Sequence, residues 1–216
     1  MESNNRSRNS KEMLAIIVAL TLVTVIAAAL LGVTDVFTRE PIIAAQRAML
    51  HRSLEQVLPA HTNNPIDDKL IWKGKGRSFP VYLARDAQGK VVALAWEVIA
   101  PDGYSGSIRI LIGVSPSGEI DAIRVTNHHE TPGLGDGIVR NRPWIDFFSG
   151  KTLTNVRWAV KKDGGDFDQF TGATITPRAV VKAVKKGLQF FRTNREKLLQ
   201  MAAHLDIQRE KGKLAA

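Results

Sequence analysis

The sequence has 216 residues, 44% of them hydrophobic, so it is long enough for one modest domain with appendages. It contains no cysteine, which excludes disulfides, zinc–thiolate sites, cysteine-ligated iron–sulfur clusters and a cysteine nucleophile. The formal net charge of +9 makes nucleic acid, anionic lipid and anionic ligands candidate partners. No basic run is interleaved with aromatic residues, so we expect no nucleic-acid binding.

Residues 13–34, MLAIIVALTLVTVIAAALLGVT, contain no charge and no proline. A helix of this length, at about 1.5 Å per residue, spans the roughly 30 Å core of a bilayer. A cleaved signal peptide is the alternative, because Ala27, Ala28 and Ala29 resemble a small-residue cleavage site. The apolar region of a signal peptide is shorter, about 7–15 residues. The stretch therefore predicts an uncleaved transmembrane helix.

The flanks of this span predict its orientation. Arg6, Arg8 and Lys11 precede it, and residues 35–40 after it carry no basic excess. Basic residues concentrate on the cytoplasmic side of membrane proteins. We expect residues 1–12 to form a cytoplasmic tail and everything after Thr34 to lie on the outer side of the membrane.

After the span, the spacing of the hydrophobic residues is first typical of a helix and then typical of strands. An amphipathic helix is expected to begin near Pro41 and to end at Pro59, and a polar loop follows, so residues 35–78 read as a connecting helix and loop. Alternating, β-rich runs then predict two hairpins, and a last strong amphipathic helix is expected from Pro177. The expected pieces are strands at 79–85, 90–99, 106–114 and 119–127, a short helix at 144–150 and one more strand at 155–160.

The predicted fold class is therefore α+β. One transmembrane helix is followed by a single domain at 79–200, with mainly antiparallel strands and flanking helices, and by a tail at 201–216.

The stretch DQFTGATITP, residues 168–177, stands at the entrance to the last helix. Thr176 and Pro177 read as an N-cap followed by proline at the first helical position, and such a helix end suits an anion such as phosphate. Gly172 and Ala173 leave room for a bulky group near the backbone. The free hydroxyl of Thr174 is placed to form a phosphoester. An ordinary turn and cap with a chance run of threonines is the alternative.

The same stretch resembles the flavinylation motif Asp-x-x-Ser/Thr-Gly-Ala-Thr of the covalent FMN-binding domains in bacterial respiratory complexes. The match is complete, at Asp168, Thr171, Gly172, Ala173 and Thr174. The resemblance implies that a dedicated flavin transferase joins FMN through its phosphate to Thr174. It also implies that Asp168 is read by the transferase rather than by the flavin.

Three longer segments, 100–106, 128–136 and 158–184, resemble the G subunit of the Rnf (Rsx) ion-translocating electron-transport complex. The C subunit of the sodium-translocating NADH:quinone reductase shares this domain. The resemblance implies a periplasmic flavoprotein anchored in the bacterial inner membrane, with other subunits of the complex as partners. Such complexes couple ferredoxin and NAD oxidoreduction to ion pumping, or keep an iron–sulfur regulator reduced.

Two of these segments supply further candidates for the FMN site. TPGL has proline and glycine at the central positions of a type II turn, whose backbone can lie against a flat ring. The neighbouring glutamate can bind the ligand or hold the loop, and the tyrosine and serine of APDGYSG can stack on the ligand or donate to it. A plain surface loop and a turn with an exposed tyrosine are the alternatives. These candidates are Tyr104, Ser105, Glu130, Thr131, Gly133 and Leu134.

Two other kinds of site are not expected. His128 and His129 are adjacent, so they point to different sides of an extended chain, and no third ligand has metal spacing. No G-x-G-x-x-G sequence follows a predicted strand, so there is no sign of a dinucleotide site. We therefore expect a redox carrier without independent turnover with NADH. The alternative is an anchored, non-redox periplasmic binding module.

Overall fold

The computed structural model describes the backbone of residues 2–74 and 76–214, and the side chains of residues 13–74, 76 and 78–205. The side chains of Arg6, Arg8 and Lys11, on which the predicted orientation rests, lie outside the described part. The chain divides into two compact units, Met1–Met49 and Leu50–Ala216, which are taken separately.

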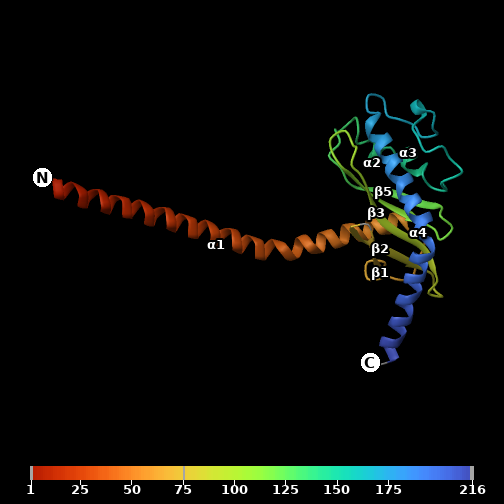
Figure 1. Ribbon diagram of the computed structural model, residues 1–216, viewed down its shortest axis with the longest axis horizontal. Helices are drawn as coiled ribbons and strands as arrows, with labels where there is room; N and C mark the ends of the chain where they lie inside the picture. Colours follow the sequence, from red (N-terminus) through yellow and green to blue (C-terminus); the bar gives the residue numbers. More distant parts are fainter. Residues whose placement is uncertain (1, 75, 215–216) are drawn as a thin grey trace. The chain divides into compact units, whose positions relative to one another are not determined.

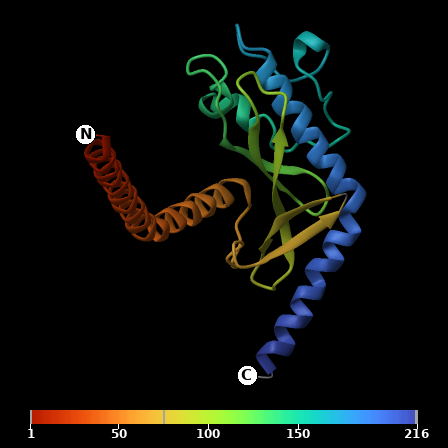
Figure 2. The same ribbon diagram turned by 60° about the vertical axis from the view of Figure 1, so that its left-hand side comes forward.

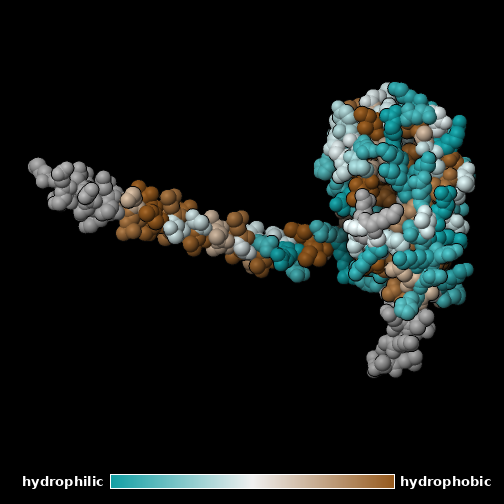
Figure 3. Space-filling model, in the orientation of Figure 1, coloured by the Kyte–Doolittle hydropathy of each residue, from teal (hydrophilic) through white to brown (hydrophobic). Residues whose placement is uncertain are grey.

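The first unit consists of most of helix α1, Glu2–Val57. From Met13 onward this helix contains a stretch long and apolar enough to cross a membrane. Its apolar side chains are exposed along this stretch, and Figure 3 shows them as the brown part that follows the grey end. Thr21, Thr24 and Thr34 each donate a 2.8 Å hydrogen bond to the carbonyl four residues earlier, which satisfies their hydroxyls in an apolar setting.

Helix α1 does not restart at Pro41, so the prediction of a separate helix from that residue is wrong. Pro41 lies inside the helix, where it has no N–H to donate to the preceding turn. Figure 2 shows α1 bending where its colour passes from red to orange. Proline is a common cause of such a bend, and the helix continues beyond it because the remaining hydrogen bonds of the ladder persist.

The second unit is built on a five-stranded antiparallel sheet in the order β1-β2-β3-β4-β5. Both predicted hairpins are confirmed, at β2–β3 and β4–β5. The strands are β1 (Lys69–Gly74), β2 (Arg77–Arg85), β3 (Val91–Ala100), β4 (Ile108–Val114) and β5 (Ile120–Asn127).

Two strand predictions differ from the structure. Strand β1 lies in the range that we expected to be a connecting helix and loop. Only Leu70 and Trp72 of β1 are buried, so its alternation is too short to stand out in the sequence. The expected strand at 155–160 is wrong, because only Val160 forms a β-bridge there, to Phe167. The expected helix at 144–150 is present in part, as α3 (Arg142–Asp146) preceded by the single turn α2 (Gly137–Arg140).

Helix α4, Ile175–Leu214, covers one face of the sheet (Figure 1). The row Trp96, Ile112 and Ile123 runs across β3, β4 and β5 on this face, by the register of the strands. Phe191 of α4 stacks on Trp96 with ring centroids 5.8 Å apart, and the neighbouring Phe190 meets Trp72 edge to face. Large interlocking side chains therefore hold α4 in place.

The last turns of α1, from Leu50 onward, cover the opposite face. The row on this side, Ala95, Gly113 and Ala122, is made of small residues. Val57 and Leu54 are 1% exposed against it. The unit is thus a sheet between two helical layers, and the α+β prediction is confirmed.

Candidate functional site

Three segments far apart in the sequence enclose a pocket of about 210 Å³ at the start of α4. Its walls come from the turn that carries Tyr104, from the loop Glu130–Gly135, and from residues 172–176. Small residues leave the space open on the side of the Thr-Gly-Ala-Thr stretch. The pocket therefore lies where the resemblance predicts a flavin.

A tight turn presents the motif to this pocket. The amide of Ala173 donates to the carbonyl of Phe170 at 3.0 Å, and Gly172 has φ 77°. That left-handed conformation is favourable for glycine and strained for residues with a Cβ. Gly172 therefore allows the chain to turn sharply after Phe170.

Helix α4 begins at Ile175, two residues earlier than predicted, so Thr174, not Thr176, occupies the N-cap position. The Thr174 carbonyl accepts the first helical hydrogen bond, from the amide of Arg178 at 3.3 Å. By position, the amides of Ile175 and Thr176 have no carbonyl partner within the helix, and Pro177 has no N–H. Two amide donors and the positive end of the helix dipole therefore lie beside the Thr174 hydroxyl.

Trp144 of α3 and Phe170 hold the segment 168–170, which precedes the turn, in place. The indole Nε1 of Trp144 donates to the carbonyl of Asp168 at 2.8 Å, and the Phe170 ring meets the Trp144 ring edge to face at 5.2 Å. A Cβ on Gly137 would lie 2.8 Å from the Phe170 ring, so α2 packs directly on that ring. The backbone of the motif is thereby held rigidly to the domain core.

The predicted turn at residues 131–134 is confirmed. The amide of Leu134 donates to the carbonyl of Thr131 at 3.2 Å, and Gly133 has φ 79°. The Asp136 side chain accepts a hydrogen bond from the amide of Gly133 at 2.8 Å and so stabilises the turn.

Glu130 joins the three walls of the pocket. Its side chain is 4% exposed, and its Oε2 accepts from the hydroxyl of Thr176 at 2.6 Å. Its Oε1 accepts from the amide of Ser105 at 3.1 Å. The carboxylate therefore connects the Tyr104 turn and the 130–135 loop to the first turn of α4.

Two ion pairs tie loops to α4 near the pocket. Lys182 meets Asp102 at 2.6 Å, and Arg178 forms a bidentate pair with Asp163 at 2.6 and 2.9 Å. The hydrogen bond and charge of Lys182 lower the pKa of Asp102, and those of Arg178 lower the pKa of Asp163. Both carboxylates stay ionised at neutral pH, so the ties persist.

The structure brings most predicted site residues together but leaves four off the pocket wall. Thr171 is exposed on the turn, and the carboxylate of Asp168 points to solvent, where it pairs with Lys161 at 2.7 Å. Ser105 contributes its amide to Glu130, and Gly133 supports the turn. The residues that do line the pocket are Tyr104, Glu130, Thr131, Leu134, Gly172, Ala173, Thr174 and Thr176.

The predicted site residues did not include two lining residues, Gly135 and Ile175. A Cβ on Gly135 would lie 2.6 Å from Glu130 Oε2, so only glycine fits there. Gly135 follows Leu134 and Ile175 follows Thr174, so their positions next to predicted site residues could have indicated them.

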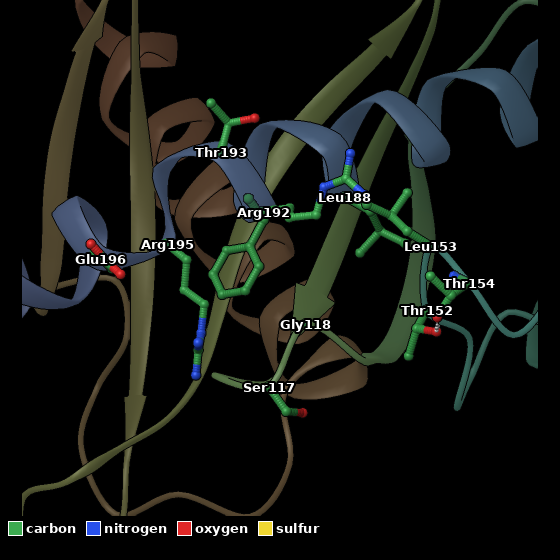
Figure 4. Close-up of a pocket in the computed structure, with 11 residues that line it drawn as sticks. Ser117, Gly118, Thr152, Leu153, Thr154, Leu188, Arg192, Thr193, Arg195 and Glu196 are labelled. Atoms are coloured by element: carbon green, nitrogen blue, oxygen red, sulfur yellow. Dashed lines mark hydrogen bonds between the residues drawn. The ribbon is translucent and has the colours of Figure 1, made fainter.

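A larger cavity, of about 520 Å³, lies elsewhere on the domain (Figure 4). It is lined by the β4–β5 turn at Ser117, by residues 152–154 and by the α4 side chains around Arg192. It contains no motif residue. Across the described side chains, no three histidine, aspartate or glutamate residues gather as a metal would require.

Residues 103–189 match the family model described as an FMN-binding domain. This range contains every lining residue of the smaller pocket. The G subunit of the ion-translocating oxidoreductase complex of Aliivibrio fischeri strain MJ11 is 45% identical over 193 residues, covering 84% of this chain and 91% of that protein. The chain belongs to this family of G subunits.

Other members of this family are similarly close. The G subunit of Pseudomonas aeruginosa strain UCBPP-PA14 is 43% identical over 202 residues, which is 88% of this chain and 93% of that protein. That of Photorhabdus laumondii is 47% identical over 192 residues, or 84% and 91%. Among solved structures, NqrC of Shewanella oneidensis aligns with a TM-score of 0.48 at 24% identity, covering 61% of this chain and 69% of that one.

Proposed function

We propose that this chain is the electron-carrying, membrane-anchored subunit of an ion-translocating oxidoreductase complex, with FMN linked by a phosphoester to Thr174. Its relatives are named as subunits of such a complex, and an FMN-binding domain model covers the pocket. One observation carries the residue assignment. Of the three threonines in residues 168–177, only Thr174 lines the pocket with a side chain that is not buried, because Thr171 is off the wall and Thr176 is buried.

The residues present suit FMN. The phosphodiester would lie at the N-terminus of α4, where amides and the helix dipole favour its single negative charge. Gly135, Gly172 and Ala173 have small side chains or none, so they leave room for the ligand at the pocket wall. The cavity, at about 210 Å³, is smaller than the roughly 300–1,000 Å³ of pockets that enclose a ligand of this size. Part of the flavin would therefore remain at the surface, against the exposed Tyr104, Leu134 and Ile175.

The attachment is a phosphoryl transfer to an alcohol. A bond forms between Thr174 Oγ1 and the phosphorus of FMN, and the pyrophosphate bond of an activated flavin nucleotide breaks. The hydroxyl proton is lost and the remaining nucleotide leaves with the electron pair of the broken bond. No oxidation or reduction accompanies this step, and a flavin transferase is the expected catalyst.

The attached flavin supplies one- and two-electron chemistry, and the chain supplies its position and surroundings. An exposed ring edge suits transfer to and from docked redox subunits. The covalent link prevents loss of the cofactor on the outer side of the membrane. We expect no useful rate of flavin reduction by NADH alone, which stopped-flow absorbance of the flavinylated chain tests.

The attachment is tested by co-expressing the full chain with a flavin transferase. We expect the intact mass to rise by FMN less one water, and the yellow colour to survive denaturation. Thr174→Ala should remove the mass gain and leave a folded, colourless protein. Thr126→Val, which removes a hydroxyl in β5 that does not line the pocket, is the matched control and should be flavinylated normally. An adduct on Thr171 or Thr176 of the wild-type chain would contradict the assignment.

The same proposal places the second unit in the periplasm and residues 1–12 in the cytoplasm. The basis is the basic N-terminal flank together with the membrane-spanning length of α1. A reporter that is active only in the periplasm, fused after Ala216, should be active. Activity from a cytoplasmic reporter at that position instead would reverse the orientation.

A further inference from the structure

Thr176 is a second alcohol two residues from the proposed attachment site, on the same helix end. Its side chain is 1% exposed, and its hydroxyl donates to Glu130 Oε2 at 2.6 Å. This hydrogen bond is short and charge-assisted, the stronger class of hydrogen bond in proteins. The hydroxyl of Thr176, the other alcohol at this helix end, is therefore buried and hydrogen-bonded to Glu130.

Glu130 is held from several directions. Its other oxygen accepts from the amide of Ser105 at 3.1 Å. Gly103 and Gly135 pack on its carboxylate so closely that a Cβ would lie 2.9 Å from Oε1 and 2.6 Å from Oε2, respectively. Both oxygens are thus engaged by the chain itself, and the carboxylate has little freedom to move.

We propose that Glu130 is a positioning residue for flavin attachment, acting through Thr176 to fix the first turn of α4. This inference rests on the proposed function. Thr176 follows Thr174 by two residues, so a fixed Thr176 sets where the Thr174 hydroxyl lies on the pocket wall. The Glu130–Thr176 bond also withholds the neighbouring hydroxyl from the incoming phosphorus.

Group transfer depends steeply on this placement. A displacement of about 1 Å can slow a positioned reaction by roughly 100-fold. Loss of the Glu130–Thr176 bond frees the helix end to fray, because helix termini have the fewest hydrogen bonds. The expected consequence is slower attachment at Thr174 in a domain that is still folded.

The experiment measures the rate of flavin attachment to the full-length chain in detergent. Purified flavin transferase and its activated flavin nucleotide are added, covalent flavin is followed by in-gel fluorescence, and the modified residue is mapped by peptide mass. Glu130→Ala should slow attachment at Thr174 by about 10- to 100-fold. Glu130→Gln keeps the shape and one acceptor for Thr176, so it should retain a rate within about threefold of wild type.

Thr176→Val removes only the donor and should slow attachment about 10-fold. If both residues act through one bond, the double variant Glu130→Ala/Thr176→Val should be no slower than Glu130→Ala, within about twofold. Thr126→Val removes a comparable threonine-to-glutamate hydrogen bond, to Glu97 at 2.9 Å on the sheet, and should leave the rate unchanged.

Several results would overturn the proposal. A wild-type rate of flavin attachment in Thr176→Val would do so. This result decides the matter even if the thermal unfolding curve shows that Glu130→Ala does not fold. Equal losses in Glu130→Gln and Glu130→Ala would overturn it as well, because the charge itself would then act directly. Additive losses in the double variant would also count against it. The proposed function fails separately, if Thr174→Ala still gains FMN or if the wild-type chain gains none, and in that case this inference fails with it.

Discussion

The two faces of the sheet are packed by opposite means. On the α4 face, Trp96 and Phe191 stack and bulky aliphatic residues fill the space around them. On the other face, Ala95, Gly113 and Ala122 lie flat, and the end of α1 approaches so closely that a Cβ on Gly113 would collide with the Val57 carbonyl oxygen. One helix is held by large side chains, the other by close approach of backbones.

This difference separates two kinds of vulnerability. A face built from large side chains is weakened when atoms are removed, because a cavity remains. A face built from small residues is weakened when atoms are added, because a backbone cannot move aside cheaply. Since α4 also carries Thr174 at its N-terminus, the large-residue face anchors the candidate site.

Phe191→Ala should have the largest effect on stability. Phe191 is 1% exposed, and its truncation leaves a cavity against Trp96, so we expect a loss of about 3–5 kcal/mol in the free energy of unfolding. Urea unfolding followed by tryptophan fluorescence measures it, because all four tryptophans lie in the second unit. Ile99→Ala, at a 52% exposed position, is the control and should change stability far less.

Gly113→Ala tests the opposite face. The added methyl group would collide with the backbone of Val57, so we expect a loss of about 1–3 kcal/mol from overpacking. The same urea titration measures it. An unchanged midpoint would show that the end of α1 can move away freely, contrary to the close packing described.

Asp121 lies at the bulge in β5, where the alternation between the two faces is interrupted. Burial, and secondarily the charge of Glu119, raise its pKa from 3.8 to about 6. The folded chain therefore binds this proton more tightly than the unfolded chain. The resulting stabilisation is complete below pH 3.8 and is lost as the pH rises through about 6.

Asp121→Asn should accordingly stabilise the protein at pH 7.5 and not below about pH 4. The shift corresponds to at most about 3 kcal/mol, which partial solvent exposure of the side chain reduces to about 1 kcal/mol. Urea unfolding of both proteins at several pH values measures the difference. A constant difference at every pH would rule out titration of Asp121 as its cause.

Gly187→Ala should have the smallest effect, although Gly187 also lies in close contact with the sheet. A Cβ there would lie 2.7 Å from Ile112 Cδ1 and 2.8 Å from Val98 Cγ1, which are side-chain ends and can shift. Alanine also favours the helix over glycine by roughly 0.5–1 kcal/mol, which offsets part of the strain. We expect a net change within about 1 kcal/mol, in contrast to Gly113→Ala, measured by the same unfolding curves.

Local patterns in the sequence were enough for much of the fold. The apolar run at 13–34 predicted the span, and the alternating runs with Asp-Ala-Gln-Gly and Ser-Pro-Ser-Gly between them predicted both hairpins. The Pro-Gly pair of the 131–134 turn predicted its geometry. These features depend on residues within a few positions of one another, and such short-range preferences are readable without the fold.

Which residues line the pocket depended on contacts between residues far apart in the sequence. Only the tertiary structure placed Thr174 rather than Thr176 at the start of α4, because Thr176 turns inward to a glutamate 46 residues earlier in the chain. It also left Thr171 and the carboxylate of Asp168 outside the pocket wall, although both belong to the motif. The sequence by itself determined which residues were candidates, through their chemistry and spacing. Which of them face the pocket was decided by burial and by long-range hydrogen bonds, which no local pattern encodes.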